Sequence, residues 1–229
     1  MGKLTPEHHA VLFALIVKRL EENWTETYRG VVKAGVRRYG FERGRRMAAR
    51  ALEHGDDCRA ENYLCYGEWR SSDYPEQQSI VEASVPYTLK VKSCCWCEAW
   101  KRHGLMEWGK LYCEDVDTAL TIGFNPEYPL ELRGILSHGA DGCRFVYPAI
   151  VMDERTKSYV SEKKKSLGDT ALRDFSYHTA HLFWTMLDET ERRLGKRGRE
   201  AVEQALNDWG GIFGAAAVDT VLSYETEKF

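Results

Sequence analysis

Residues 94–143 read CCWCEAWKRHGLMEWGKLYCEDVDTALTIGFNPEYPLELRGILSHGADGC, and this stretch decides the fold class. Its first part has helical composition up to Gly104, and a second helix is predicted over residues 112–122. The rest predicts a β-hairpin, in which LELRGILSH and CRFVYPAIV are the strands and GADG is the turn. Helices and an antiparallel pair within one stretch indicate an α+β protein.

A further strand is expected before this stretch. Apolar and polar residues alternate from Val81 through Ala83 to Val91, as in a strand with one buried face. Pro86 indicates an edge strand or a bulge, because proline cannot donate a hydrogen bond to a sheet. A shorter alternation over residues 63–69 also favours extended structure. The sequence therefore predicts a small antiparallel sheet with packed helices.

Helical patterns precede this centre. Thr5 and Pro6 are the residue types preferred at an N-cap and at a first helical position. Further helices are predicted over residues 28–39 and 42–54, with Gly40 in the turn between them.

Helical patterns also follow the centre. Residues 153–168 are charged, show no apolar period and are predicted to be a linker. Asp169 is expected to cap a helix that reaches Leu194, and another helix is predicted over residues 197–209. The expected organisation, within one compact unit, is an N-terminal helical arm at 1–58, a central α+β region at 59–152 and a C-terminal helical hairpin at 153–229.

The composition argues against several classes of partner. The chain carries 32 basic and 35 acidic residues, and this net charge of −3 indicates neither nucleic acid nor an anionic membrane as a partner. No run approaches the roughly 20 apolar residues of a membrane span. Without signal-peptide features, a cytoplasmic protein is expected, whose seven cysteines indicate metal binding, catalysis or burial. The amphipathic helices at both ends are compatible with a homodimer.

Two pairs of residues that include cysteine could carry chemistry. Cys113 and Asp117 would share one face of a helix, where a thiol and a carboxylate form a nucleophile and base or bind a metal. The structural alternative is a buried thiol near a surface aspartate. Cys94 and Cys97 have the spacing of zinc or redox sites, but a zinc ribbon needs a second pair, which the sequence lacks. Burial in the core remains the alternative for these cysteines.

His138 and Cys143 flank the GADG turn, so a hairpin would bring them close together. An imidazolium beside a thiol lowers the pKa of that thiol, whereas the bland alternative is a solvated histidine. Trp96 and Trp100 could line a pocket for a flat ring, although such residues more often belong to the core.

A metal site is a further hypothesis. Asp174, His178 and His181 are spaced to lie on one stripe of the predicted long helix. Two imidazoles and a carboxylate suit a divalent metal such as zinc, manganese or iron. A polar seam between helices is the structural alternative.

Several residues recur in the order of a known family. They are YGFERGRRMAARAL at residues 39–52, followed by Cys94, Trp96, Trp100, Gly104-Leu105, Gly109, Tyr112-Cys113, Asp117, Gly123-Phe124-Asn125-Pro126, His138-Gly139, Asp141, Cys143 and Phe145. In these residues the chain resembles the L-2-amino-thiazoline-4-carboxylic acid hydrolase-like family, over residues 40–147.

The resemblance implies a hydrolase that opens a small cyclic amidine-like substrate at the carbon between its heteroatoms. That step needs a nucleophile, a base and an acid. We hypothesise that Cys94 or Cys113 is the nucleophile or a metal ligand, and that Asp117 is the base. His138 would carry the proton near Cys143. Asn125, Trp96 and Trp100 would orient the ring of the small-molecule substrate.

Two other functions stay open. A non-catalytic small-molecule or metal-binding module of the vinyl-reductase-domain type would use the same aromatic and thiol residues, and it would bind a ligand without forming product. A thiol redox protein would depend on Cys94 and Cys97, and titration of thiols with and without reductant would reveal it.

Overall fold

The computed structural model describes residues 3–82 and 84–229, which fold into two compact units. The first unit comprises the residues up to Tyr39, Cys95–Asp115 and Asp174–Phe229, and the second comprises Gly40–Cys94 and Val116–Arg173. The consecutive segments 1–58, 59–152 and 153–229 are not these units, because each unit is assembled from separate parts of the chain.

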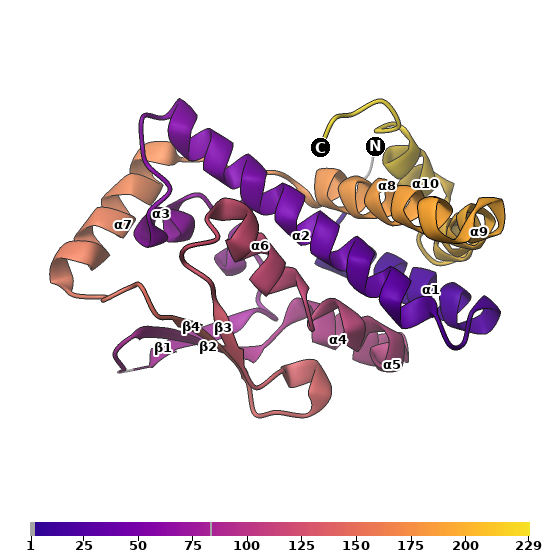
Figure 1. Ribbon diagram of the computed structural model, residues 1–229, viewed down its shortest axis with the longest axis horizontal. Helices are drawn as coiled ribbons and strands as arrows, with labels where there is room; N and C mark the ends of the chain where they lie inside the picture. The colour runs from indigo at the N-terminus through magenta and orange to yellow at the C-terminus, as the bar shows by residue number, and fades with distance from the viewer. Residues whose placement is uncertain (1–2, 83) are drawn as a thin grey trace. The chain divides into compact units, whose positions relative to one another are not determined.

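The first unit is helical. It contains α1 (Pro6–Asn23), the first part of α2 (Tyr28–Glu53), α4 (Cys95–Arg102), α5 (Met106–Gly109), the 3-10 helix η2 (Lys110–Tyr112), α8 (Phe175–Leu194), α9 (Lys196–Phe213) and α10 (Ala215–Leu222). Helix α1 begins at Pro6 after Thr5, as predicted, and packs against α4, α8 and α9 (Figure 1). Trp209 donates from its indole to the backbone oxygen of His8 at 2.9 Å, which holds α9 against α1.

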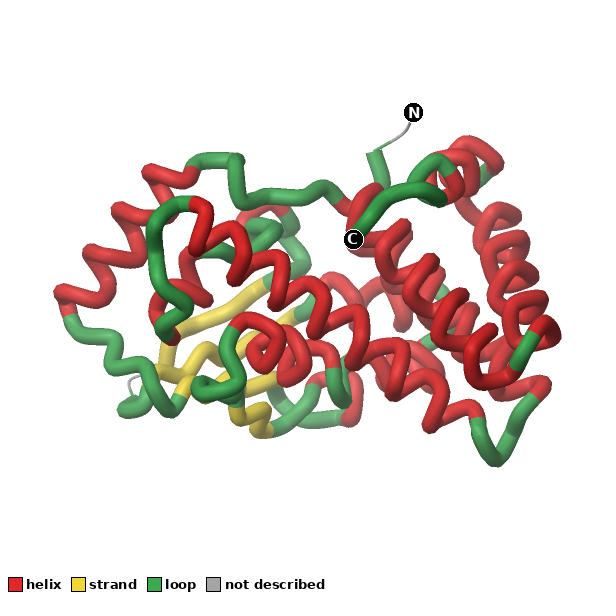
Figure 2. The backbone as a smooth tube through the Cα atoms, turned by 45° about the horizontal axis from the view of Figure 1, so that its top comes forward, coloured by secondary structure: helices red, strands yellow, loops and turns green. Residues whose placement is uncertain are grey.

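The second unit combines helices with an antiparallel sheet. It contains the rest of α2, α3 (Ala60–Cys65), the 3-10 helix η1 (Ser71–Asp73), β1 (Gln78–Glu82), β2 (Tyr87–Ser93), α6 (Val116–Phe124), β3 (Glu131–Arg133), the 3-10 helix η3 (Leu136–His138), β4 (Cys143–Tyr147) and α7 (Glu154–Leu167). The four strands have the order β1-β2-β4-β3 and are drawn in yellow in Figure 2. The predicted α+β class with a small antiparallel sheet is confirmed.

The strand expected over residues 81–91 is instead two strands. β1 and β2 pair antiparallel, with Glu82 opposite Thr88, so the chain turns back between them, just before β2. Pro86 lies in this turn, where its missing N–H removes no bond from the sheet. Ala83, which the alternation included, lies outside the described residues.

Strand β4 is one of the two inner strands of the sheet. It pairs with β3, as the predicted hairpin requires, and also with β2, where Val91 lies opposite Cys143 and Tyr87 opposite Tyr147. Cys94 directly follows the last residue of β2. The register therefore places the last residues of β2 next to the first residues of β4, at one end of the strands.

Helix α2 is continuous, so the turn expected at Gly40 is wrong. A Cβ atom on Gly44 would lie 2.0 Å from the carbonyl oxygen of Leu120, and one on Gly123 would lie 2.2 Å from the oxygen of Phe41. These glycines let the backbones of α2 and α6 touch, which a larger residue would prevent. Glycine is used here for close helix packing, and this need is invisible in the local sequence.

Three other local predictions are corrected. The expected linker at 153–168 is helix α7, in which the Asp153 side chain accepts a hydrogen bond from the Thr156 N–H at 2.8 Å. Its few apolar residues pack on the core of the second unit, and they are enough to hold the helix there. The cap of the long helix is Asp174 rather than Asp169. Residues 63–69 do not form a strand, because α3 runs to Cys65 and residues 66–69 have no regular secondary structure.

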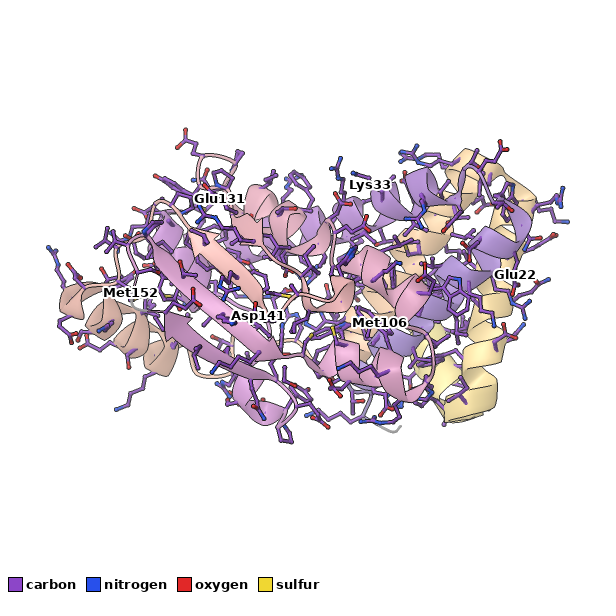
Figure 3. All side chains as sticks on the ribbon, turned by 90° about the horizontal axis from the view of Figure 1, so that it is seen from below. Glu22, Lys33, Met106, Glu131, Asp141 and Met152 are labelled. Atoms are coloured by element: carbon purple, nitrogen blue, oxygen red, sulfur yellow. The ribbon has the colours of Figure 1, made fainter. Side chains whose placement is uncertain are left out.

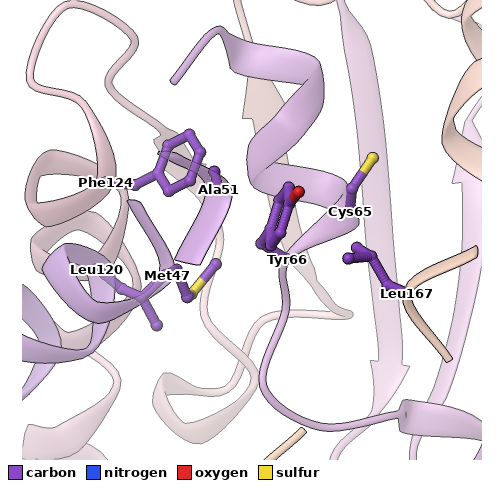
Figure 4. Close-up of a cluster of buried hydrophobic side chains, with 7 residues drawn as sticks. All are labelled: Met47, Ala51, Cys65, Tyr66, Leu120, Phe124 and Leu167. Carbon is purple, nitrogen blue, oxygen red and sulfur yellow. The ribbon is translucent and has the colours of Figure 1, made fainter. Parts of the chain in front are cut away.

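A buried cluster joins α2, α3, α6 and α7 in the second unit (Figure 4). Its members are Met47, Ala51, Cys65, Tyr66, Leu120, Phe124 and Leu167. This cluster fixes α6 against α2 and so supports the residues that α6 presents. Among the residues that the structure describes, no helix has the length and apolar character needed to cross a bilayer.

Candidate active site

Asp117 lies in the first turn of α6 and keeps part of its surface accessible. Burial raises the pKa of Asp117 to about 6; Cys94 raises this pKa as well, and the guanidinium of Arg43 lowers it. A carboxyl group with a pKa near 6 can both accept and return a proton near neutral pH. This property marks Asp117 as a candidate acid–base group.

Two thiols accompany Asp117, and we call Asp117, Cys94 and Cys143 the acid–thiol site. Cys143 is buried, and its sulfur accepts a hydrogen bond from the Leu136 N–H at 3.2 Å. Burial raises the pKa of Cys143 to about 11, and the nearby Cys94 and Asp117 add to this rise. Cys94 is only partly buried. Cys143 is therefore a neutral thiol near pH 7, and Cys94 is the more accessible of the two.

A shallow aromatic pocket lies in the same unit as this site. It is open to solvent, has an enclosed volume of only about 10 Å³, and is lined by Ala60, Tyr63, Thr121, Phe124, Asn125, Tyr128, Pro129, Tyr147, Pro148, Ala149 and Ile150. The rings of Tyr63 and Tyr147 lie 6.0 Å apart, and the ring of Phe124 lies 5.7 Å from Tyr63.

Tyr63 and Tyr147 connect the pocket to the acid–thiol site. Burial raises the pKa of both phenols, and the charge of Asp117 raises it further. Both phenols therefore stay protonated near neutral pH. The pocket offers aromatic walls with a few hydroxyl groups whose pKa values respond to the charge of Asp117.

The model of the L-2-amino-thiazoline-4-carboxylic acid hydrolase family matches residues 6–147, which is more than half of the chain. The chain belongs to this family. The match runs from the start of α1 to the end of β4 and includes the whole acid–thiol site. The name of the family implies hydrolase activity. Comparison with curated proteins and with solved structures gives no match.

Cys113, a candidate nucleophile of this hydrolase, does not lie on a helix with Asp117. The helix expected over residues 112–122 is present, but it begins only at Val116, after η2 has ended at Tyr112. Cys113 belongs to the first unit and Asp117 to the second. The argument from helical spacing therefore fails, while a role for Cys113 itself stays a prediction.

His138 is exposed in η3 and does not face Cys143 across two strands. The connection between β3 and β4 is longer than the four residues GADG, because β3 ends at Arg133 and η3 follows it. Cys143 is instead met by the backbone of Leu136. The role of His138 as a proton carrier stays a prediction.

Asp141, part of the family resemblance, has a structural role in the same connection. Its side chain is labelled in Figure 3. Its carboxylate pairs with Lys90 at 2.6 Å and with Arg144 at 2.9 Å. These charge-assisted bonds tie the turn to β2 and β4. They keep the pKa of Asp141 well below its usual range.

The residues expected to orient the ring lie in different units: Asn125 in the second, and Trp96 and Trp100 in the first. Asn125 lines the pocket, but its amide donates to the Cys58 oxygen at 3.0 Å and accepts from the Glu127 N–H at 2.9 Å, so it mainly shapes the loop. Trp96 and Trp100 lie in the core of the first unit, and the pocket lining belongs entirely to the second. A role for either tryptophan in orienting the ring stays a prediction.

The expected metal ligands are not a ligand set. The Asp174 carboxylate caps α8 by accepting the Tyr177 N–H at 2.9 Å. His178 and His181 are buried in the first unit, where the ring of His181 lies 4.7 Å from that of Tyr39. Over residues 3–82 and 84–229, no three His, Cys, Asp or Glu side chains are grouped to hold a metal ion.

Two residues near the site, Tyr147 and Arg43, were missed from the sequence, while Tyr63 was one of several aromatic residues expected to line a pocket. Tyr63 and Tyr147 are ordinary aromatic residues in the chain, and only the pairing of β4 with its neighbours and the packing of α3 bring them together. Arg43 lies within the family motif YGFERGRRMAARAL, which was the one available signal. Its position beside Asp117 depends on the glycine contact between α2 and α6.

Proposed function

We propose that this protein is a hydrolase that opens a small cyclic amidine-like ring, of the thiazoline-carboxylate type, at the carbon between its two heteroatoms. The observation that carries the proposal is Asp117: burial raises its pKa to about 6 and the partly buried Cys94 adds to this rise, which suits Asp117 to act as an acid–base group toward that thiol. Membership of the hydrolase family and the aromatic pocket of the same unit support it.

In the proposed reaction, Asp117 accepts the proton of the Cys94 thiol as the sulfur attacks the ring carbon. A bond from this carbon to a ring heteroatom then breaks, and Asp117 returns the proton to the departing atom. The ring is now open and joined to Cys94 through a carbon–sulfur bond. Water activated by Asp117 attacks the same carbon and expels the Cys94 thiolate, which takes back a proton. The net change is addition of one water to the substrate.

The aromatic pocket would hold the planar ring while this occurs. Tyr63 and Tyr147 remain protonated, so their hydroxyl groups can donate hydrogen bonds to a heteroatom that gains negative charge. Binding the ring beside an otherwise desolvated carboxylate converts the attack into a reaction within one complex.

The test is turnover of the 2-aminothiazoline-4-carboxylate by the purified chain, with hydantoins and related rings as comparison substrates and mass spectrometry as the readout. We expect a product heavier by one water and a transient adduct on the peptide that contains Cys94. Cys58→Ser is the matched control, because Cys58 is a partly buried thiol of the same unit that bonds the Ala48 oxygen at 3.9 Å. Tight binding with no product would instead support a binding module.

A metal could also contribute, and the same preparation tests this. Metal content is measured before and after dialysis against a chelator, together with turnover. A loss of turnover that a divalent metal restores would replace the metal-free thiol route with a metal-assisted one.

A further inference from the structure

A cluster of three arginines surrounds one glutamate in the second unit. Arg43, Arg46 and Arg50 are spaced along one face of α2, and all three point to Glu68, whose side chain is fully buried. Arg43 donates to Glu68 at 3.1 Å and Arg46 donates to both of its oxygens at 2.7 and 3.0 Å. Arg50 lies at 3.9 Å from Glu68 and donates to the Ala171 oxygen at 2.7 Å. We call these four residues the arginine cluster.

Burying the charged groups of the arginine cluster lowers the stability of the folded protein. Removing charged groups from water carries a large energetic penalty, and three guanidinium groups approach the same buried carboxylate of Glu68 at 3.1, 2.7 and 3.9 Å. Arg43 and Arg50 have side chains that are only 9% and 8% exposed. A purely structural need for one ion pair would be met by one arginine, so the cluster invites a further role for at least one member.

The contact between α2 and α6 singles out Arg43. Gly40 and Gly44 flank Arg43 on α2, and a Cβ on either glycine would collide with the backbone of α6, at Val116 and at Leu120. Asp117 lies between these two α6 positions in sequence. Arg43, which Glu68 holds, and Asp117 therefore lie on two helix segments whose backbones touch at the residues on either side of each.

We infer that Arg43 is a positioning residue of the acid–thiol site. Glu68 holds Arg43 in place, and Arg43 keeps Asp117 ionised so that Asp117 can act as the base. This inference rests on the proposed function for its consequence in catalysis, but its electrostatic part does not need turnover. Arg43 is the cation that lowers the pKa of Asp117, against the effects of burial and of Cys94. The same charge lowers the pKa of Tyr63.

The other groups that face Asp117 act in the opposite direction or stay neutral. Cys94 at the end of β2 raises the pKa of Asp117. Cys143 and Tyr147 on β4 and Tyr63 on α3 are held protonated by their own raised pKa values. Arg43 therefore supplies the positive charge that offsets desolvation of Asp117 within the described part of the second unit.

The chain offers a matched control. Arg46 is bound to the same Glu68 and is also largely buried, with a side chain 14% exposed. Arg43→Gln and Arg46→Gln each remove one guanidinium from the arginine cluster, so both should lower stability. Only Arg43→Gln should change the ionisation of Asp117.

The experiment follows the carboxyl carbon of Asp117 by carbon NMR during a pH titration of the whole protein, with Asp117→Asn used to assign the signal. The wild type should titrate near pH 6. Arg43→Gln should move the midpoint upward by about one pH unit, and Arg46→Gln should leave it in place. Equal midpoints in wild type and Arg43→Gln, or equal shifts in both variants, would overturn the inference.

Arg43→Lys covers the case in which Arg43→Gln does not fold. It keeps the positive charge, so the midpoint should stay near that of the wild type, whereas an upward shift as large as one unit would contradict a role carried by charge. Turnover is measured on the same samples. If the midpoints move as expected but no variant or wild type shows turnover, the proposed function fails and the electrostatic role of Arg43 stands.

Discussion

The acid–thiol site of the second unit and the buried histidines of the first unit contain equally reactive side chains in different surroundings. His9 is fully buried; its Nδ1 accepts from the Trp96 indole at 3.1 Å, and its Nε2 lies 3.0 Å from the Tyr39 hydroxyl. Because an indole N–H only donates, the proton of the His9 ring is on Nε2. Both ring nitrogens are therefore used inside the core.

Asp117 differs in the two properties that chemistry requires. It remains partly accessible, and its pKa is raised to about 6 by burial. The comparison teaches that residue type alone does not define a site. A titratable group becomes a candidate when it is both displaced from its usual pKa and reachable by a ligand.

The largest expected effect is on turnover. Asp117→Asn and Cys94→Ser should each lower kcat/KM by about 100-fold or more, since general acid–base catalysis typically contributes factors of this size. His9→Phe should leave kcat/KM of the folded protein within a few-fold of wild type. Steady-state kinetics on the thiazoline carboxylate checks this, with circular dichroism to confirm folding. Wild-type rates in both site variants would remove the distinction between the two regions.

The next effect is on stability, and it has an unusual sign. The pKa of Asp117 is 3.8 ordinarily and about 6 when folded, so the folded state keeps a proton that the unfolded state has lost between these values. Stability is therefore lost as pH rises from below 3.8 to above 6. This penalty amounts to at most about 3 kcal/mol, and to less because the side chain is partly accessible.

Asp117→Asn should therefore unfold at higher denaturant concentration than wild type at pH 7, by roughly 1–3 kcal/mol, and this advantage should shrink near pH 4. Urea unfolding at both pH values measures it. A variant that is less stable than wild type at pH 7 would show that Asp117 is a structural residue like His9.

In the first unit, a substitution should lower stability and leave turnover unchanged. His9→Phe removes the acceptor of Trp96 and the partner of Tyr39, and it leaves both polar groups buried, which costs about 1–3 kcal/mol. Urea unfolding should report this loss without a change in the pH dependence of turnover. An unchanged midpoint for unfolding would mean that these hydrogen bonds contribute little to the core.

The smallest effect is expected at the pocket wall. Tyr128→Ala shortens one side of the pocket without touching the acid–thiol site, so it should raise KM several-fold and leave kcat nearly unchanged. The matched control is Tyr74→Ala, at an aromatic residue of the same unit that packs on Trp69 and does not line the pocket. Equal KM values in the two variants would show that the ring binds elsewhere.

The sequence was informative where local chemistry decides the structure. The cap at Thr5, the helix after Cys94 and the pairing of β3 with β4 follow from turn and capping residues, and they were predicted. The family was also recognisable, because its residues are spread over the matched region. These features need no knowledge of distant parts of the chain.

Other features depended on tertiary packing and could not be read locally. Gly40 is typical of a turn in sequence, yet it is needed where α2 touches α6. Cys113 has helical spacing to Asp117, but the helix begins three residues after it. The pocket tyrosines and Arg43 acquire their roles only when α2, α3 and β4 meet around α6. Residue spacing drew attention to Asp117, whose catalytic role stays a prediction, and paired it with Cys113 through a helix that begins only after Cys113.

The most direct test of the central claim is the pH dependence of kcat/KM for the thiazoline carboxylate in wild type. The account requires Asp117 to be ionised in the free enzyme, so kcat/KM should fall tenfold per pH unit below a midpoint near pH 6, and Asp117→Asn should abolish that limb together with the activity. A midpoint near the ordinary aspartate value of 3.8, or an unaltered profile in Asp117→Asn, would contradict it.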